Sequence, residues 1–209
     1  MPRTPADAET GTRRCAVLYP AVAEAAHRVV AKAVGLIDLG GSTGPNLQVD
    51  RVGIAYSNGQ SLGDPSSPVQ LSCSLVGERT VPTRAVPEVV ARVGVDLDPV
   101  AVDVLPDAVA RVPAHALPVV TTTWALSALP LEGRLRFLHR LDDAAAGRAV
   151  AWVSVEGVGV APSIPTLGDR RASGHSIVGL AVFDGAALHA EAIGRCWSRG
   201  RWLAWLADS

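Results

Sequence analysis

The clearest candidate for a binding site in this chain is the segment 34–46, which has the sequence VGLIDLGGSTGPN. An apolar run, typical of a buried parallel strand, ends at Asp38. The turn after it has room for a nucleoside or for a positive φ at three glycines, Gly40, Gly41 and Gly44. Pro45 suits the first position of a helix, where no hydrogen-bond donor is needed. Strand, glycine turn and helix N-terminus together indicate a nucleotide-cofactor site of a doubly wound α/β fold. The alternative is a tight turn that binds no ligand.

The spacing within this turn separates two cofactor classes. A dinucleotide fingerprint, G-x-G-x-x-G, would need glycines at positions 40, 42 and 45, where Ser42 and a proline replace two of them. It also needs an acid about 20 residues further on, where the chain has Gln60. The pattern acid-x-Gly-x-Gly-x-Gly, typical of S-adenosylmethionine sites, is met at Asp38, Gly40 and Gly44, with Ser42 in place of the middle glycine. The spacing therefore favours S-adenosylmethionine over a nicotinamide dinucleotide.

A second pair of acids follows the next predicted core strand. The segment 94–99, GVDLDP, contains Asp96 and Asp98. A carboxylate at the end of this strand could accept hydrogen bonds from both hydroxyls of a ribose. The alternative is that Asp96 and Asp98 only cap the strand end.

The other residues that could act in catalysis or bind a metal carry only weak indications of such a role. Glu156 follows a later predicted strand and would lie at the same edge of the sheet. The sequence Gly174-His175-Ser176 is not a nucleophile elbow, because Val178 stands where G-x-S-x-G requires glycine. The histidines have no metal-ligand spacing, and the three cysteines indicate buried thiols rather than disulfides or a metal site. Methyl transfer is compatible with this scarcity, since aligning donor and acceptor can supply much of the rate enhancement.

Composition describes an ordinary globular chain. It has 209 residues, of which 48% are hydrophobic and 19% charged, enough to bury a core in one domain. The formal net charge of −1 argues against a dominant electrostatic role in binding nucleic acid. There is no long apolar segment of about 18 residues, so we expect no membrane span and a cytoplasmic location.

Hydrophobic periodicity predicts alternating helices and parallel strands that end in a hairpin. We expect residues 1–12 to form a flexible tail and residues 13–209 a single α/β domain. Parallel-type strands are predicted at 34–37, 91–98, 117–123 and 149–155, helices at 16–33, 107–112 and 131–146, and a hairpin over 176–193. The stripe of the 131–146 helix that we expect to be buried consists of Leu131, Leu135, Leu138 and Leu141. The Asn-Gly pair and the alternation within residues 48–85 predict an inserted antiparallel excursion.

Several long segments resemble a bacterial family of uncharacterised proteins, domain of unknown function 2332. They are RRCAVLYPAVAEAA at 13–26, LIDLGGSTGPNLQVDR at 36–51, GDPSSPVQLSC at 63–73, RVGVDLDPV at 92–100, ALPVVTTTWALSALP at 116–130, RAVAWVSVEG at 148–157 and RGRWLAWL at 199–206. The resemblance implies a Rossmann-like, class I methyltransferase-type sheet, mostly parallel, with the strand order 3-2-1-4-5-7-6. It names a fold more than an activity.

Compared with that family, the chain looks shortened at the N-terminus and directly after residue 99. The resemblance therefore implies that the third core strand is missing, and with it one wall of the adenine pocket. Asp103 is then the displaced acid that normally follows this strand near the adenine.

Two hypotheses follow. The first is a methyltransferase-like domain that binds S-adenosylmethionine through Asp38, Gly40, Gly41, Ser42, Gly44, Asp96, Asp98 and Asp103. Its methyl acceptor, whether a small molecule or a macromolecule, is not indicated. The second is a non-catalytic or vestigial protein of the same fold with an incomplete cofactor pocket.

Overall fold

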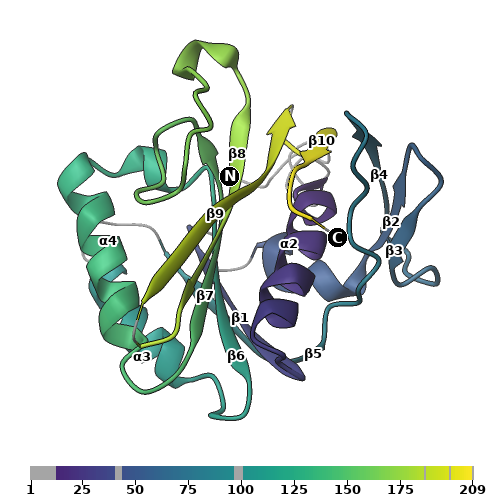
Figure 1. The fold of residues 1–209 in the computed structure, drawn as a ribbon. Helices are drawn as coiled ribbons and strands as arrows, with labels where there is room; N and C mark the ends of the chain where they lie inside the picture. Colours follow the sequence, from purple (N-terminus) through teal and green to yellow (C-terminus); the bar gives the residue numbers. More distant parts are fainter. Residues whose placement is uncertain (1–12, 41–43, 97–100, 186, 198, 209) are drawn as a thin grey trace, which may run out of the picture.

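A computed structural model of the chain describes residues 13–40, 44–96, 101–185, 187–197 and 199–208. In these residues it forms one open, ten-stranded sheet with the order β3-β2-β4-β10-β9-β8-β7-β6-β1-β5 (Figure 1). The strands are β1 Ala33–Leu39, β2 Gly53–Tyr56, β3 Ser61–Gly63, β4 Gln70–Leu75, β5 Glu88–Val95, β6 Leu117–Thr123, β7 Val150–Gly157, β8 Ser176–Phe183, β9 Leu188–Trp197 and β10 Trp202–Trp205. The fold class is mixed α/β, as the sequence predicts.

Helices cover both faces of the central strands (Figure 1). On one face lies α2, Cys15–Arg28; on the other lie α3, Leu105–Ala110, and α4, Leu131–Ala144. Among the described residues, four 3-10 helices lie in the connections between these elements: η1 Pro45–Arg51, η2 Ala101–Val104, η3 Leu126–Ala128 and η4 Arg171–Ser173. All seven residues of β1 are buried, with Leu36 in the α2-side core and Ile37 in the α4-side core. Burial on both faces explains why this strand is a continuous apolar run.

The central strands β5, β1, β6 and β7 are parallel neighbours, as predicted. In the described residues the sheet ends at β5, which is the arrangement expected of a chain without a third core strand.

The C-terminal hairpin is confirmed, but its place in the sheet differs from the implied order 3-2-1-4-5-7-6. That order would put the second strand of the hairpin beside β7, whereas the first strand, β8, lies there, antiparallel to β7. The connection 158–175 contains only the short η4, with no helix to carry the chain back to the starting edge. The next strand therefore begins where β7 ends and must run antiparallel to it.

The excursion at 48–85 is only partly antiparallel. The hairpin β2–β3 closes through the predicted turn, in which Gly59 has a φ of +88°. Strand β4, however, runs parallel both to β2 and to β10 near the C-terminus. The pairing with β10 joins the excursion to the far end of the main sheet, a contact that local sequence does not indicate.

Two helix predictions need correction. The helix predicted at 16–33 ends at Arg28, because Val30 takes a φ of +55° and β1 already begins at Ala33. In α4 the predicted buried stripe is displaced, since Leu131 is 66% and Leu135 44% exposed.

The buried residues of α4 are Phe137 and Leu141, so Leu141 of the predicted stripe is buried as expected, whereas Leu131 and Leu135 are not. Phe137 packs edge-on against Trp152 of β7, with 5.1 Å between ring centroids. The large aromatic side chain thus determines which side of the helix faces the sheet, and the leucines of the first turns stay outside.

No helix in the described part of the chain is both long and apolar enough to cross a membrane. The three cysteines, Cys15, Cys73 and Cys196, are buried free thiols, as predicted.

Candidate functional site

Of the predicted site residues, Gly40 and Asp96 directly follow the neighbouring parallel strands β1 and β5, so the fold brings these two positions to one edge of the sheet. Leu39 at the end of β1 pairs with Val95 at the end of β5 and with Thr122 near the end of β6. Gly40 donates its backbone N–H to the carbonyl of Val95 over 2.8 Å. The glycine turn and the acid that follows β5 are therefore neighbours, as the parallel arrangement requires.

Asp38 lies within β1 and is only 2% exposed. Its Oδ1 accepts hydrogen bonds from Asn46 Nδ2 at 3.0 Å and from Thr121 Oγ1 at 2.7 Å. Burial raises the pKa of this carboxyl from 3.8 to about 6, although both hydrogen bonds and the charge of Arg14 act in the opposite direction. Through these hydrogen bonds, the buried Asp38 stabilises the glycine-rich turn from the strand side.

The turn itself has the backbone that its glycines allow. Gly40 has a φ of +94°, a conformation that favours glycine. Pro45 occupies the first turn of the following helix, as predicted, but that helix is the 3-10 helix η1, with a non-helical residue at Gln48. Gly44, directly before it, is extended, with φ −78° and ψ 157°. Gly41 and Ser42 lie outside the described residues.

Of the two acids after β5, Asp96 directly follows the strand and is exposed. It follows Val95, the residue whose carbonyl holds the N–H of Gly40. An exposed carboxylate beside a glycine turn can accept hydrogen bonds from a ligand's hydroxyl groups. Asp98 lies outside the described residues.

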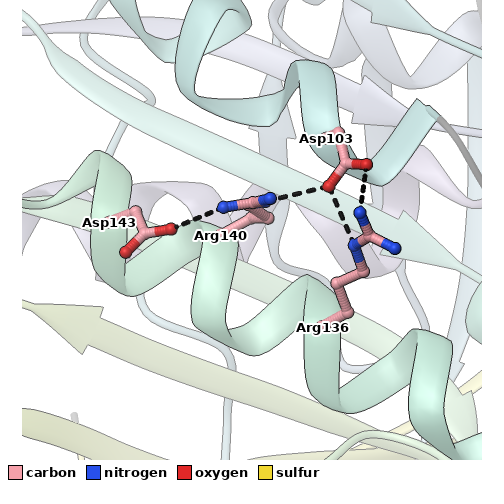
Figure 2. Close-up of polar contacts among 4 residues, drawn as sticks. All are labelled: Asp103, Arg136, Arg140 and Asp143. Atoms are coloured by element: carbon pink, nitrogen blue, oxygen red, sulfur yellow. Dashed lines mark hydrogen bonds and ion pairs between the residues drawn. The ribbon is translucent and has the colours of Figure 1, made fainter.

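Asp103 is engaged by two arginines of α4 (Figure 2). Arg136 binds its carboxylate in a bidentate manner, Nε to Oδ1 at 2.9 Å and Nη2 to Oδ2 at 2.6 Å. Arg140 Nε approaches Oδ1 at 2.9 Å and also contacts Asp143 through Nη1. Arg140, followed by Arg136, lowers the pKa of Asp103. These contacts tie η2 to α4, and they occupy the carboxylate that the resemblance would assign to an adenine site.

Arg14 and Trp124, which carried no functional signal in the sequence, also lie at this edge of the sheet. The guanidinium of Arg14 lies over the ring of Trp124, 5.1 Å from its centroid, and donates to Thr123 Oγ1 at 3.1 Å. Trp124 has a φ of +54° and donates through Nε1 to Ser176 Oγ at 2.8 Å. Arg14 precedes Thr123 by 109 residues, so no local pattern could indicate this contact.

Thr123 joins these contacts to the Asp38 network, because its Oγ1 also accepts from Asn46 Nδ2 at 3.0 Å. A continuous set of polar contacts thus runs below the edge, from Asp38 to Ser176.

Glu156, a weak candidate in the sequence, is 1% exposed near the end of β7. Its Oε1 accepts the N–H groups of Ala125 at 3.0 Å and Leu126 at 3.1 Å, and Oε2 has no hydrogen-bond partner among the described residues. Burial raises the pKa of Glu156 from 4.5 to about 7, against the effect of the two N–H donors. It is thus a buried carboxyl that can exchange a proton near neutral pH, and its observed contacts hold the segment after β6.

Metal binding has no support in the part of the chain that the structure describes. No group of three or more His, Cys, Asp or Glu side chains there is arranged to hold an ion. At the carboxyl edge of the strands, the turn at Gly40 and the exposed carboxylate of Asp96 lie over the buried hydrogen bonds of Asp38. Such an arrangement suits binding and orienting a polar ligand.

Comparison with known proteins identifies one family. The model of a family described as uncharacterized protein conserved in bacteria, domain of unknown function 2332, matches residues 8–103 and 100–205. The chain therefore belongs to this family. The two matched segments meet near residue 100, just after β5. No curated protein and no solved structure matches the chain.

Proposed function

We propose that this family member binds a nucleoside-containing ligand at the carboxyl edge of β1 and β5, with S-adenosylmethionine as the expected cofactor of a methyltransferase-like domain. The observation that carries the proposal is the bond from Gly40 N–H to Val95 O, which holds a positive-φ glycine turn beside the exposed Asp96. The acid-x-Gly spacing at Asp38 and Gly40 favours the adenosyl ligand over a dinucleotide.

The residues have distinct proposed roles. Asp96 accepts hydrogen bonds from the ribose hydroxyls, and Gly40, Gly41 and Gly44 let the backbone approach the ligand. Ser42 takes the place of the middle glycine of the pattern in this turn. The ligand's sulfonium group would supply an activated methyl for an in-line displacement, for which the protein has to orient the acceptor.

Two further acids complete the proposed site. Asp38 fixes the turn from below through Asn46 and Thr121. Asp98 remains a proposed neighbour of the ligand. The methyl acceptor, a small molecule or a macromolecule, is left open.

A second candidate is a non-catalytic member of the fold with an incomplete pocket. It is supported by β5, which ends the sheet in the described residues and so leaves the outer side of the Asp96 region without a strand. It is also supported by Asp103, whose carboxylate is occupied by Arg136 and Arg140.

Calorimetric titration of the full chain with S-adenosylhomocysteine distinguishes the two. The first proposal predicts saturable heat at one site per chain, and reduced nicotinamide dinucleotide should give none. Absence of heat with S-adenosylhomocysteine at millimolar concentration, in a preparation with a cooperative thermal transition, would favour the non-catalytic alternative.

A further inference from the structure

One side of α4 carries apolar side chains that nothing in the described part of the chain covers. Leu131 and Leu135 are 66% and 44% exposed, and together with Glu132, Arg136 and His139 they line an open surface hollow. All five residues belong to this one helix. A hollow lined by a single helix is too open to enclose a small molecule, but it can receive side chains from another helix.

The spacing of these residues orders them into two rows. Leu131 and Leu135 are four residues apart and lie above one another on the helix surface. Glu132 and Arg136 are also four residues apart and form the adjacent row. The opposite side of the helix, at Phe137 and Leu141, is buried against the sheet. The exposed rows therefore form one apolar seam with one charged flank.

The charged flank has opposite signs at its two positions. Arg136 is held in place by Asp103 through Nε and Nη2 (Figure 2), a bidentate contact that restricts its side chain. Glu132 is exposed and has no ion-pair partner among the described residues. Along this flank, a negative charge is thus followed one turn later by a fixed positive charge.

We propose that α4 is the contact surface between two copies of this chain, which pair through antiparallel α4 helices around a two-fold axis. In an antiparallel pair related by such an axis, each flank meets the same flank of the partner. Glu132 of one copy then lies opposite Arg136 of the other, and the reverse pair forms at the same time. Leu131 and Leu135 of both copies fill the seam between them.

Charge complementarity selects this occupant. Arg136 uses Nε and Nη2 on Asp103, and its Nη1 faces no acceptor in that pair, so a second copy can offer a Glu132 carboxylate to Arg136 and an Arg136 guanidinium to Glu132. A helix of 14 residues is about 21 Å long, so the contact is small and the dimer is expected to be weak. The proposal is independent of the ligand site, which lies at the carboxyl edge of the strands.

Charge-exchange variants test the pairing by sedimentation velocity, over protein concentrations from about 5 to 300 µM, the range in which a weak dimer dissociates. Wild type should shift from monomer to dimer over this range. Glu132→Arg alone brings two guanidinium groups together at both ends of the contact, and Arg136→Glu alone brings two carboxylates together, so both should remain monomeric. An equimolar mixture of the two variants restores both opposite-charge pairs and should again form a dimer. Glu78→Arg, an exposed charge reversal outside α4, is the matched control and should dimerise like wild type.

Because Arg136→Glu also removes a contact to Asp103, thermal unfolding must show that each variant is folded. The Glu132→Arg result does not depend on that contact. Leu135→Ser should weaken the dimer by removing apolar contact area while leaving Glu132 and Arg136 unchanged. A wild type that stays monomeric throughout, or a Glu132→Arg variant that dimerises unchanged, would overturn the proposal. So would a mixture that remains monomeric when both single variants are folded.

Discussion

Asn46 Nδ2 lies 3.0 Å from Asp38 Oδ1, so a residue just after the glycine-rich turn is bonded to a residue just before it. The same amide also donates to Thr123 Oγ1 at 3.0 Å, which connects β1, the start of η1 and the end of β6. This buried contact closes the base of the turn from which Gly40 reaches Val95.

Replacing Asn46 with alanine should therefore destabilise the fold. The variant loses two buried hydrogen bonds and leaves Asp38 with one donor fewer, at a cost of about 2–3 kcal/mol in the free energy of unfolding. Urea unfolding followed by circular dichroism measures it. Asn58→Ala, in the exposed turn between β2 and β3, is the matched control and should cost well under half as much. Equal losses for the two variants would show that the Asn46 network contributes little.

Glu156 should make stability fall as the pH rises. Its pKa is about 7 in the folded chain against an ordinary 4.5, so between these values the folded state holds a proton that the unfolded state has released. Raising the pH through this window therefore destabilises the fold, by roughly 3 kcal/mol once the pH exceeds 7. Glu156→Gln removes this contribution, and the variant should gain stability over wild type at pH 8 compared with pH 4.5.

Asp38 also makes the free energy of unfolding fall as the pH rises, but at lower pH, because its pKa is raised from 3.8 to about 6. The difference between the wild-type and Glu156→Gln unfolding curves isolates the Glu156 contribution, with Glu78→Gln as the exposed control. A difference that is constant from pH 4.5 to 8 would contradict the assignment.

Gly35 is required for packing rather than for a turn. A Cβ at this position would overlap the side chain of Val112, which follows α3 and packs on β1. Gly35→Ala should therefore lower the free energy of unfolding by about 1–3 kcal/mol. Gly157→Ala is the control, since a Cβ there meets only Val160 at an ordinary 3.5 Å, and it should be close to neutral. Chemical denaturation that ranks the two variants equally would refute the packing argument.

If S-adenosylhomocysteine binds, Asp96→Asn should weaken it by about tenfold or more, because a charge-assisted hydrogen bond to a ribose hydroxyl is replaced by a neutral one. Thermal stability should hardly change, since Asp96 is exposed. Asp142→Asn, the same substitution at an exposed position of α4, should bind like wild type. Calorimetry on the three proteins decides the point, and unchanged affinity in Asp96→Asn would remove Asp96 from the site.

The local sequence pattern was sufficient to predict the strands that are buried on both faces. The apolar runs at 34–37, 117–123 and 149–155 fall within or overlap β1, β6 and β7, and the hairpin over 176–193 overlaps β8 and β9. It was insufficient for α4, where leucine spacing correctly predicted the burial of Leu141 but not the exposure of Leu131 and Leu135, because Phe137 packs on Trp152. Several faces of a helix can satisfy the same periodicity, and only the shape of the sheet beneath it distinguishes them.

Neighbouring residues are enough to predict an α/β chain with a strand, a glycine-rich turn and an acid after the next strand, because these features are local in the sequence. Long-range packing, by contrast, places β8 antiparallel beside β7, pairs β4 with β10, and binds Asp103 to α4. It also decided the surroundings of Asp38, which is supported by Asn46 and Thr121 from separate segments. Most of these contacts join residues far apart in the chain, and the energies of all of them depend on burial and geometry that exist only after the elements have packed together.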